Sequence, residues 1–201
     1  CTGYHGSQTI EQALANSCNC AFGAIALELG ADTLAEYAEK LGITQELELD
    51  GITIPAGSFD KAEAGSIGLA WSGIGQYNDL VVPYALVRYV CAIANGGSIY
   101  EPTLLGHGSL ERETEILSAD TASRIAEMMN NNVQTAYGSW NFPNLNVSAK
   151  TGTAEVGDGT SHAWMTGFLN DPAHPYAFVV LVENAGGGLT NARPVGNSVV
   201  Q

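Results

Sequence analysis

The sequence is poor in basic residues. Its 201 residues include 7 lysines and arginines against 21 aspartates and glutamates, which gives a formal net charge of −14. A chain this acidic is repelled by the phosphates of nucleic acids and by anionic lipid headgroups, so we expect no nucleic-acid partner. Long apolar runs are also missing. The longest, residues 81–94, is interrupted by Pro83 and Arg88 and predicts a buried helix rather than a membrane span.

Cysteine is scarce as well, with four residues: Cys1, Cys18, Cys20 and Cys91. These are too few for a disulfide scaffold, and no C-x-x-C pair is present. They leave the disulfide state and the redox compartment open. Because His5, His107 and His174 stand without ligand spacing, we predict no metal site, and no motif indicates a cofactor.

The composition that is present, 45% apolar and 14% charged, is typical of a folded domain. In the first half, apolar residues recur at helical spacing. Asp32 is the expected N-cap of one helix, and residues 43–60 are expected to form a loop. The predicted helices cover residues 8–15, 19–29, 33–41, 62–71, 81–94 and 118–131.

The second half changes to the period of strands. Residues 146–156, 162–170 and 176–183 predict three antiparallel strands, and residues 189–201 predict a helix that packs back onto them. The fold class is therefore α+β. Residues 176–182 are continuously apolar, which favours a strand covered on both faces. As the last strand of three it could also lie at an open edge, so we expect an exposed apolar face and self-association.

Lys150-Thr151-Gly152-Thr153 lies inside the first predicted strand. One interpretation is an ordinary surface strand. The other is a substrate rim, in which Lys150 supplies a cation, the two threonines supply hydroxyls, and Gly152 allows close approach of another backbone. The edge of such a strand can bind an extended peptide or stabilise an oxyanion through its N–H groups.

Ser17-Cys18-Asn19 opens a predicted apolar helix. Ser17 can be a helix cap, or a hydroxyl that relays a proton beside an amide that holds a substrate carbonyl. The pattern S-x-N is weak alone, because Ser139-Trp140-Asn141 matches it equally well. If Ser17 and Lys150 share a proton path, they must lie within hydrogen-bond reach.

Taken in order, these motifs resemble the transpeptidase domain of class B penicillin-binding proteins. The resemblance covers nearly the whole chain, and the order of the motifs makes it specific. The matching stretches are 14–22 (LANSCNCAF), 73–76 (GIGQ), 93–97 (IANGG) with Glu101-Pro102, 149–155 (AKTGTAE) and 162–168 (HAWMTGF). The resemblance implies the penicillin-binding and serine β-lactamase-like fold.

The resemblance also implies roles for individual residues. Ser17 would shuttle a proton, Asn19 would hold the substrate's amide, and Lys150 would bond Ser17 and favour an anionic substrate. Thr151 and Thr153 would bind the terminal carboxylate beside Gly152, and the Thr153 N–H would form half of an oxyanion hole. For Gln76 a structural turn is as plausible as a role in the site. For His162 and Trp164 we favour core packing or strand pairing.

The family's nucleophile belongs to an S-x-x-K motif upstream of S-x-N, and residues 1–16 contain none. Ser58 and Lys61 fit the pattern but follow S-x-N and are not expected to act. We therefore expect residues 1–201 to be the C-terminal part of one transpeptidase domain, to contain no nucleophile and to be inactive alone.

By resemblance, the full-length protein would be anchored to the outer face of the bacterial membrane by an upstream segment. It would cross-link peptidoglycan stem peptides that end in D-Ala-D-Ala through an acyl-serine, and β-lactams would trap that serine. A serine β-lactamase and a non-catalytic β-lactam sensor or scaffold module remain as alternatives. A transmembrane segment and an S-x-x-K motif upstream would support the transpeptidase, and a signalling domain upstream would support the sensor.

Overall fold

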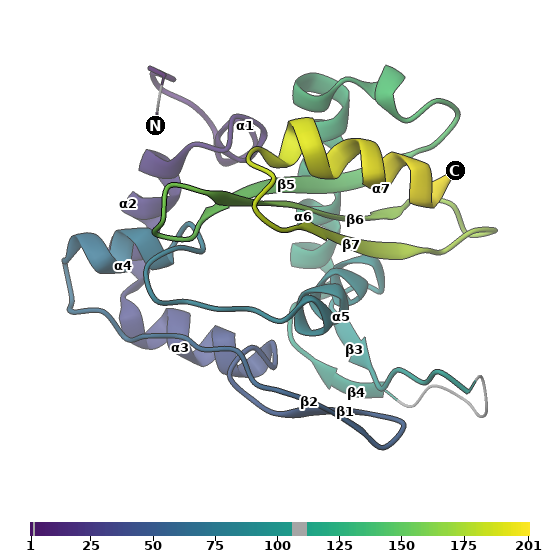
Figure 1. The fold of residues 1–201 in the computed structure, drawn as a ribbon, viewed down its shortest axis with the longest axis horizontal. Coiled ribbons are helices and arrows are strands. Elements are labelled where there is room, and N and C mark those ends of the chain that lie inside the picture. Colours follow the sequence, from purple (N-terminus) through teal and green to yellow (C-terminus); the bar gives the residue numbers. More distant parts are fainter. Residues whose placement is uncertain (2, 106–111) are drawn as a thin grey trace.

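The computed structural model describes residues 1, 3–105 and 112–201. A group of helices precedes the sheet in the sequence and lies at one end of the molecule (Figure 1). It consists of α1 (Ile10–Ala15), α2 (Asn19–Leu29), α3 (Ala31–Lys40) and α4 (Ile67–Ser72). α2 and α4 pack so closely that a Cβ at Gly73, the residue that ends α4, would lie 2.3 Å from the Ala26 Cβ of α2.

The centre of the molecule is an antiparallel sheet with the strand order β5-β6-β7. Its strands are β5 (Val147–Glu155), β6 (Ser161–Leu169) and β7 (Ala177–Val182). Helices α5 (Pro83–Ala94) and α6 (Ala119–Asn132) cover one face, and α7 (Arg193–Val200) covers the other (Figure 1). The α+β prediction with three C-terminal strands is confirmed.

The alternation of side chains along β5 separates two sets of residues. Val147 and Ala149 belong to the buried cluster that also contains Met165, Phe178 and Val180. Gly196 of α7 packs against the last three of these side chains. The intervening Ser148 donates to the Ala126 carbonyl of α6 at 2.9 Å. Because side chains alternate, Lys150 lies on the α6 side and the threonines at 151 and 153 on the other.

Residues 43–60, which were predicted to be a loop, contain a hairpin, so that prediction is wrong. β1 (Leu47–Leu49) pairs with β2 (Ile52–Ile54). Asp50 and Gly51 form the turn with φ values of 47° and 81°. A two-residue turn with both φ values positive fits the twist of paired strands, and Asp-Gly is its preferred sequence. A second unpredicted pair joins β3 (Ser98–Tyr100) to β4 (Arg112–Glu115).

Two predicted helix starts are also wrong. The helix expected over 62–71 begins only at Ile67, because Gly65 has a φ of 73° and Ser66 is the N-cap, accepting the Leu69 N–H. Asp32 lies in the first turn of α3, and Gly30 is its N-cap. An aspartate in the first turn still stabilises the helix through its dipole.

The prediction of a largely exposed apolar face on β7 is wrong. α5 and α7 cover its two faces, and Phe178 and Val180 are only 6% and 8% exposed. Among the described strands β7 has one neighbour, β6, so its outer edge is open, as the sequence indicated. Self-association through that edge stays a prediction.

Among the described residues, three short irregular helices complete the connections. α6 continues through the π-helical turn η1 (Val133–Tyr137) into the 3-10 helix η2 (Ser139–Asn141). A second π-helical turn, η3 (Gly188–Ala192), leads from the sheet into α7. In the part of the chain that the structure describes, no helix has the length and apolar character needed to cross a bilayer.

Candidate active site

A cavity of about 870 Å³ lies beside the outer edge of β5, which pairs with no other strand among the described residues. The α1–α2 turn, α2, α4, η1, β5 and the start of η3 form its walls. All six predicted site residues line it. The lining includes Ser17, Asn19, Lys150, Thr151, Gly152, Thr153, Trp71, Gln76, Tyr137 and Gly188.

Ser17 occupies a strained turn between α1 and α2. Its φ is 48°, and the turn is closed by two backbone bonds: Ser17 N–H to Leu14 O at 3.1 Å and Cys18 N–H to Ala13 O at 2.9 Å. This is the Schellman ending of a helix, in which the left-handed position is usually glycine. Serine there costs conformational energy, and such strain is concentrated at functional sites.

The turn places the Ser17 hydroxyl next to Lys150. The Lys150 Nζ donates to Ser17 Oγ at 2.6 Å across a sequence separation of 133 residues, and it also donates to the Thr151 carbonyl at 2.6 Å. The predicted proximity of Ser17 and Lys150 is confirmed. It identifies Ser17-Cys18-Asn19, rather than residues 139–141, as the S-x-N sequence that faces the strand.

Burial lowers the pKa of the Lys150 ammonium from its ordinary value of 10.5 to about 8. Desolvation disfavours the charged form of a lysine. A group with this pKa exchanges a proton readily near neutral pH. The Ser17 hydroxyl and the Lys150 amine therefore form a two-member path along which a proton can move.

Asn19 and the two threonines border the same space. Asn19 is the first residue of α2 and is exposed toward the cavity. The Thr151 N–H donates to Tyr137 Oη at 3.1 Å, and Thr153 Oγ1 accepts the Gly188 N–H at 3.2 Å. Since the Thr153 hydroxyl accepts this bond, its own proton is available for an anionic group.

Gly188 and Tyr137 are site residues that the sequence analysis missed. A Cβ on Gly188 would lie 2.2 Å from the Gly152 carbonyl oxygen and 2.5 Å from the Trp164 carbonyl oxygen. The glycine is therefore required for η3 to cross the sheet next to the site. The run of three glycines at 186–188 was the available signal. For Tyr137 the sequence offered no signal.

The other residues that the sequence singled out lie in structural roles. Ser58 donates to the Asn78 carbonyl at 3.0 Å, and Lys61 pairs with Asp32 at 2.5 Å, so these two do not form a nucleophile pair. His162 Nδ1 accepts the Asn184 N–H at 3.0 Å within the sheet region. Gln76 lines the cavity, whereas Trp164 pairs with Gly152 across β5 and β6.

His5, which has no ligand spacing in the sequence, does lie near other possible metal ligands in the fold. His5 lies beside Cys1 and Cys18, with the ligand atoms of all three within 4.8 Å of one another. A hydrogen bond from His5 is the largest cause that lowers the pKa of the Cys18 thiol to about 7. His174 instead pairs with Asp171 at 2.8 Å, and His107 lies outside the described residues.

Comparisons with known proteins point to one family. The profile of the penicillin binding protein transpeptidase domain matches residues 2–201. The peptidoglycan D,D-transpeptidase PbpA of Mycobacterium tuberculosis is 28% identical over 217 residues, covering 96% of this chain and 43% of the relative. Penicillin-binding protein 3 of Bacillus subtilis is 28% identical over 173 residues, covering 79% of this chain and 26% of the relative.

Solved structures agree with this assignment. The ceftriaxone acyl-enzyme complex of M. tuberculosis penicillin-binding protein A matches with a TM-score of 0.88 and 25% identity, covering 98% of this chain and 49% of that one. The transpeptidase domain of the Eggerthella lenta peptidoglycan glycosyltransferase has the same fold, with a TM-score of 0.83, 24% identity, and coverage of 98% of this chain and 54% of that one. The chain thus spans about half the length, or less, of the proteins that it matches.

Proposed function

The chain belongs to the penicillin-binding protein transpeptidase domain family, and from this premise we propose that it forms the substrate-binding part of a class B peptidoglycan D,D-transpeptidase. The substrate is a stem peptide that ends in D-Ala-D-Ala. The acceptor is an amine of a neighbouring stem peptide. The reaction takes place on the outer side of the cell membrane, where peptidoglycan is assembled.

The proposed reaction is an acyl transfer in two steps. A serine Oγ from the upstream part of the domain attacks the carbonyl carbon between the two terminal D-alanines. The C–N bond breaks, and the departing D-alanine amine takes up the proton that the serine lost. The acceptor amine then attacks the ester and loses a proton, so the enzyme serine regains its hydrogen and a new amide is formed.

In this reaction Ser17 and Lys150 carry the proton to the leaving nitrogen. Lys150 donates to Ser17 when charged, and the lowered pKa allows it to return a proton through the Ser17 hydroxyl. Asn19 holds an amide of the substrate, and the outer edge of β5 beside Thr153 pairs with the extended peptide. The Thr151 and Thr153 hydroxyls bind the terminal carboxylate, and the Thr153 N–H contributes to the oxyanion hole.

One observation supports this proposal more than any other: Lys150 Nζ lies 2.6 Å from Ser17 Oγ within a cavity that residues 150–153 of β5 line. A surface strand does not require a partly desolvated lysine or a serine in a left-handed turn. Both features weaken the fold and have a clear use in proton transfer.

The test is D-alanine release by the full-length protein, with a D-Ala-D-Ala peptide as donor and an amine as acceptor. We expect Thr153→Val to lower kcat/KM, because it removes the hydroxyl for the carboxylate while conserving side-chain volume. Thr160→Val, in the exposed turn between β5 and β6, is the matched control and should act like the wild type. Covalent penicillin binding without any D-alanine release would contradict the transpeptidase and indicate a sensor.

A further inference from the structure

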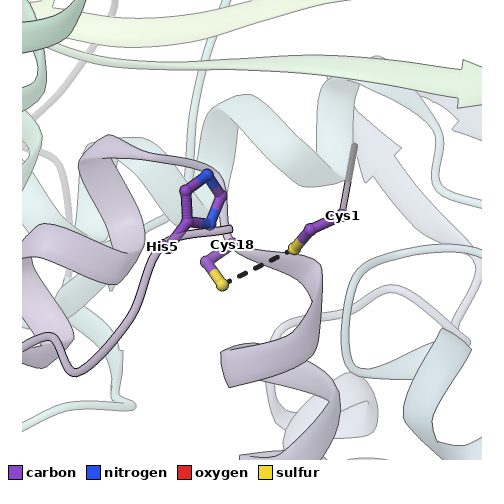
Figure 2. Close-up of side chains that lie close together, drawn as sticks. All are labelled: Cys1, His5 and Cys18. Carbon is purple, nitrogen blue, oxygen red and sulfur yellow. Dashed lines mark hydrogen bonds between the residues drawn. The ribbon is translucent and has the colours of Figure 1, made fainter. Parts of the chain in front are cut away.

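Three side chains with metal-binding atoms converge beside the S-x-N turn: Cys1, His5 and Cys18 (Figure 2). Their ligand atoms all lie within 4.8 Å of one another, and the two sulfurs are 3.6 Å apart. Cys1 and His5 belong to the segment before α1, whereas Cys18 is the N-cap residue of α2. The cluster therefore joins two segments that α1 separates in the sequence.

The spacing of these atoms fits a tetrahedral ion. A zinc ion with bonds of about 2.3 Å to sulfur and 2.0 Å to nitrogen requires the two sulfurs to be about 3.8 Å apart. It also requires the imidazole nitrogen to lie about 3.5 Å from each sulfur. Small side-chain adjustments would complete this geometry. Two thiolates and an imidazole favour zinc or another thiophilic ion over magnesium or calcium.

The backbone around the cluster supports metal-bound sulfur. The Cys20 N–H donates to Cys1 Sγ at 3.4 Å. This donor belongs to the first turn of α2, whose end carries partial positive charge. Hydrogen bonds of this kind orient ligands and stabilise thiolates in metal centres. The net charge of −14 further favours a bound cation.

We propose that Cys1, His5 and Cys18 bind one Zn²⁺ ion, with water as the fourth ligand. Binding displaces the thiol protons to solvent. The ion takes no part in acyl transfer. It fixes Cys18, which lies between Ser17 and Asn19 and whose N–H closes the turn that holds Ser17 in its left-handed conformation. The site is thus a structural clamp on the S-x-N turn, beyond the function proposed above.

The test is Zn²⁺ binding to the full-length protein, purified without a polyhistidine tag, stripped with a chelator and kept reduced. Calorimetry should show one equivalent of Zn²⁺ per chain. His5→Ala and Cys1→Ser, at exposed positions where folding should be unaffected, should weaken binding more than about 100-fold. The matched controls His174→Ala and Cys91→Ser, checked by circular dichroism, should bind as the wild type does.

Cobalt substitution gives a second readout that is independent of activity. Reduced wild-type protein with Co²⁺ should show a thiolate-to-metal charge-transfer band that Cys18→Ser loses. The proposal is overturned if reduced protein binds no Zn²⁺, or if His5→Ala binds it unchanged. It is also overturned if Cys1 and Cys18 form a disulfide and the reduced pair shows no metal affinity. None of these outcomes depends on whether the protein is a transpeptidase.

Discussion

At the scale of single residues, the site is marked by two side chains in unfavourable environments. Ser17 adopts a φ of 48°, where glycine is normally found, and Lys150 is buried enough for its pKa to fall to about 8. Each feature costs folding free energy, and the two side chains meet at 2.6 Å.

Ser17→Gly should be more stable than Ser17→Ala by about 1 kcal/mol, because both variants lose the hydroxyl but only glycine relieves the left-handed backbone. Urea unfolding of the two variants measures the difference. In the full-length protein both should lose acylation to a similar extent. Equal stability of the two variants would mean that the turn is not strained.

Lys150 should make the folded state more stable as the pH rises. Its pKa is about 8 when folded and 10.5 ordinarily, so between these values the unfolded chain binds more protons. The free energy of unfolding should therefore increase from pH 8 to 10.5, by on the order of 1–3 kcal/mol relative to Lys150→Met. Parallel pH profiles for the wild type and Lys150→Met would contradict the lowered pKa.

At the scale of elements, the close approach of η3 to β5 positions the rim of the site. Gly188→Ala would place a methyl group 2.2 Å from the Gly152 carbonyl oxygen. The added methyl group would collide with backbone, which cannot move aside as a flexible side chain can. We therefore expect the free energy of unfolding to fall by about 1–3 kcal/mol. Urea unfolding measures this loss.

The neighbouring Gly187 is a matched control for this substitution. A Cβ there has only the Thr190 hydroxyl within reach, at 3.8 Å, and its φ of −76° suits any residue. Gly187→Ala should change stability by less than about 0.5 kcal/mol. Similar effects of the two substitutions would show that η3 is free to shift away from β5.

The sequence was sufficient to predict elements whose apolar residues follow a clear pattern. It was insufficient where the conformation depends on tertiary contacts between distant segments. The strands β5, β6 and β7 followed from apolar runs between turns. The β1–β2 hairpin was missed although Asp50-Gly51, flanked by alternating apolar residues, is a strong local signal. The Gly188 crossing and the Tyr137 contact depend on how distant segments pack, and no local pattern encodes them.

The site residues also divide into those that the sequence could predict and those that only the packing brings together. Ser17, Asn19 and Lys150 could be named from motifs, because the chemistry constrains their identities and order. The cluster of Cys1, His5 and Cys18 could not, because its members are spaced irregularly and meet only when α1 folds between them. The motifs thus named the residues that the proposed reaction uses, whereas the cluster on which the zinc proposal rests became visible only in the structure.

At the scale of the whole molecule, the chain spans 43% of the length of M. tuberculosis PbpA, and we propose that the nucleophile lies outside residues 1–201. We expect the isolated chain, residues 1–201, to form no covalent adduct with a penicillin. Mass spectrometry after incubation measures this. A stoichiometric adduct would contradict the assignment, and an adduct on Ser58 would identify a nucleophile that the geometry argues against.

The central claim is that Lys150 acts on the reaction through Ser17. The most direct measurement is the rate at which a fluorescent penicillin acylates the full-length protein, compared between Lys150→Met and Lys40→Met. Lys40 is an exposed lysine of α3, paired with Glu36 and outside the cavity lining. We predict that Lys150→Met slows acylation by about 10²–10³-fold, while Lys40→Met leaves the rate unchanged. A folded Lys150→Met protein that is acylated at the wild-type rate would contradict the account.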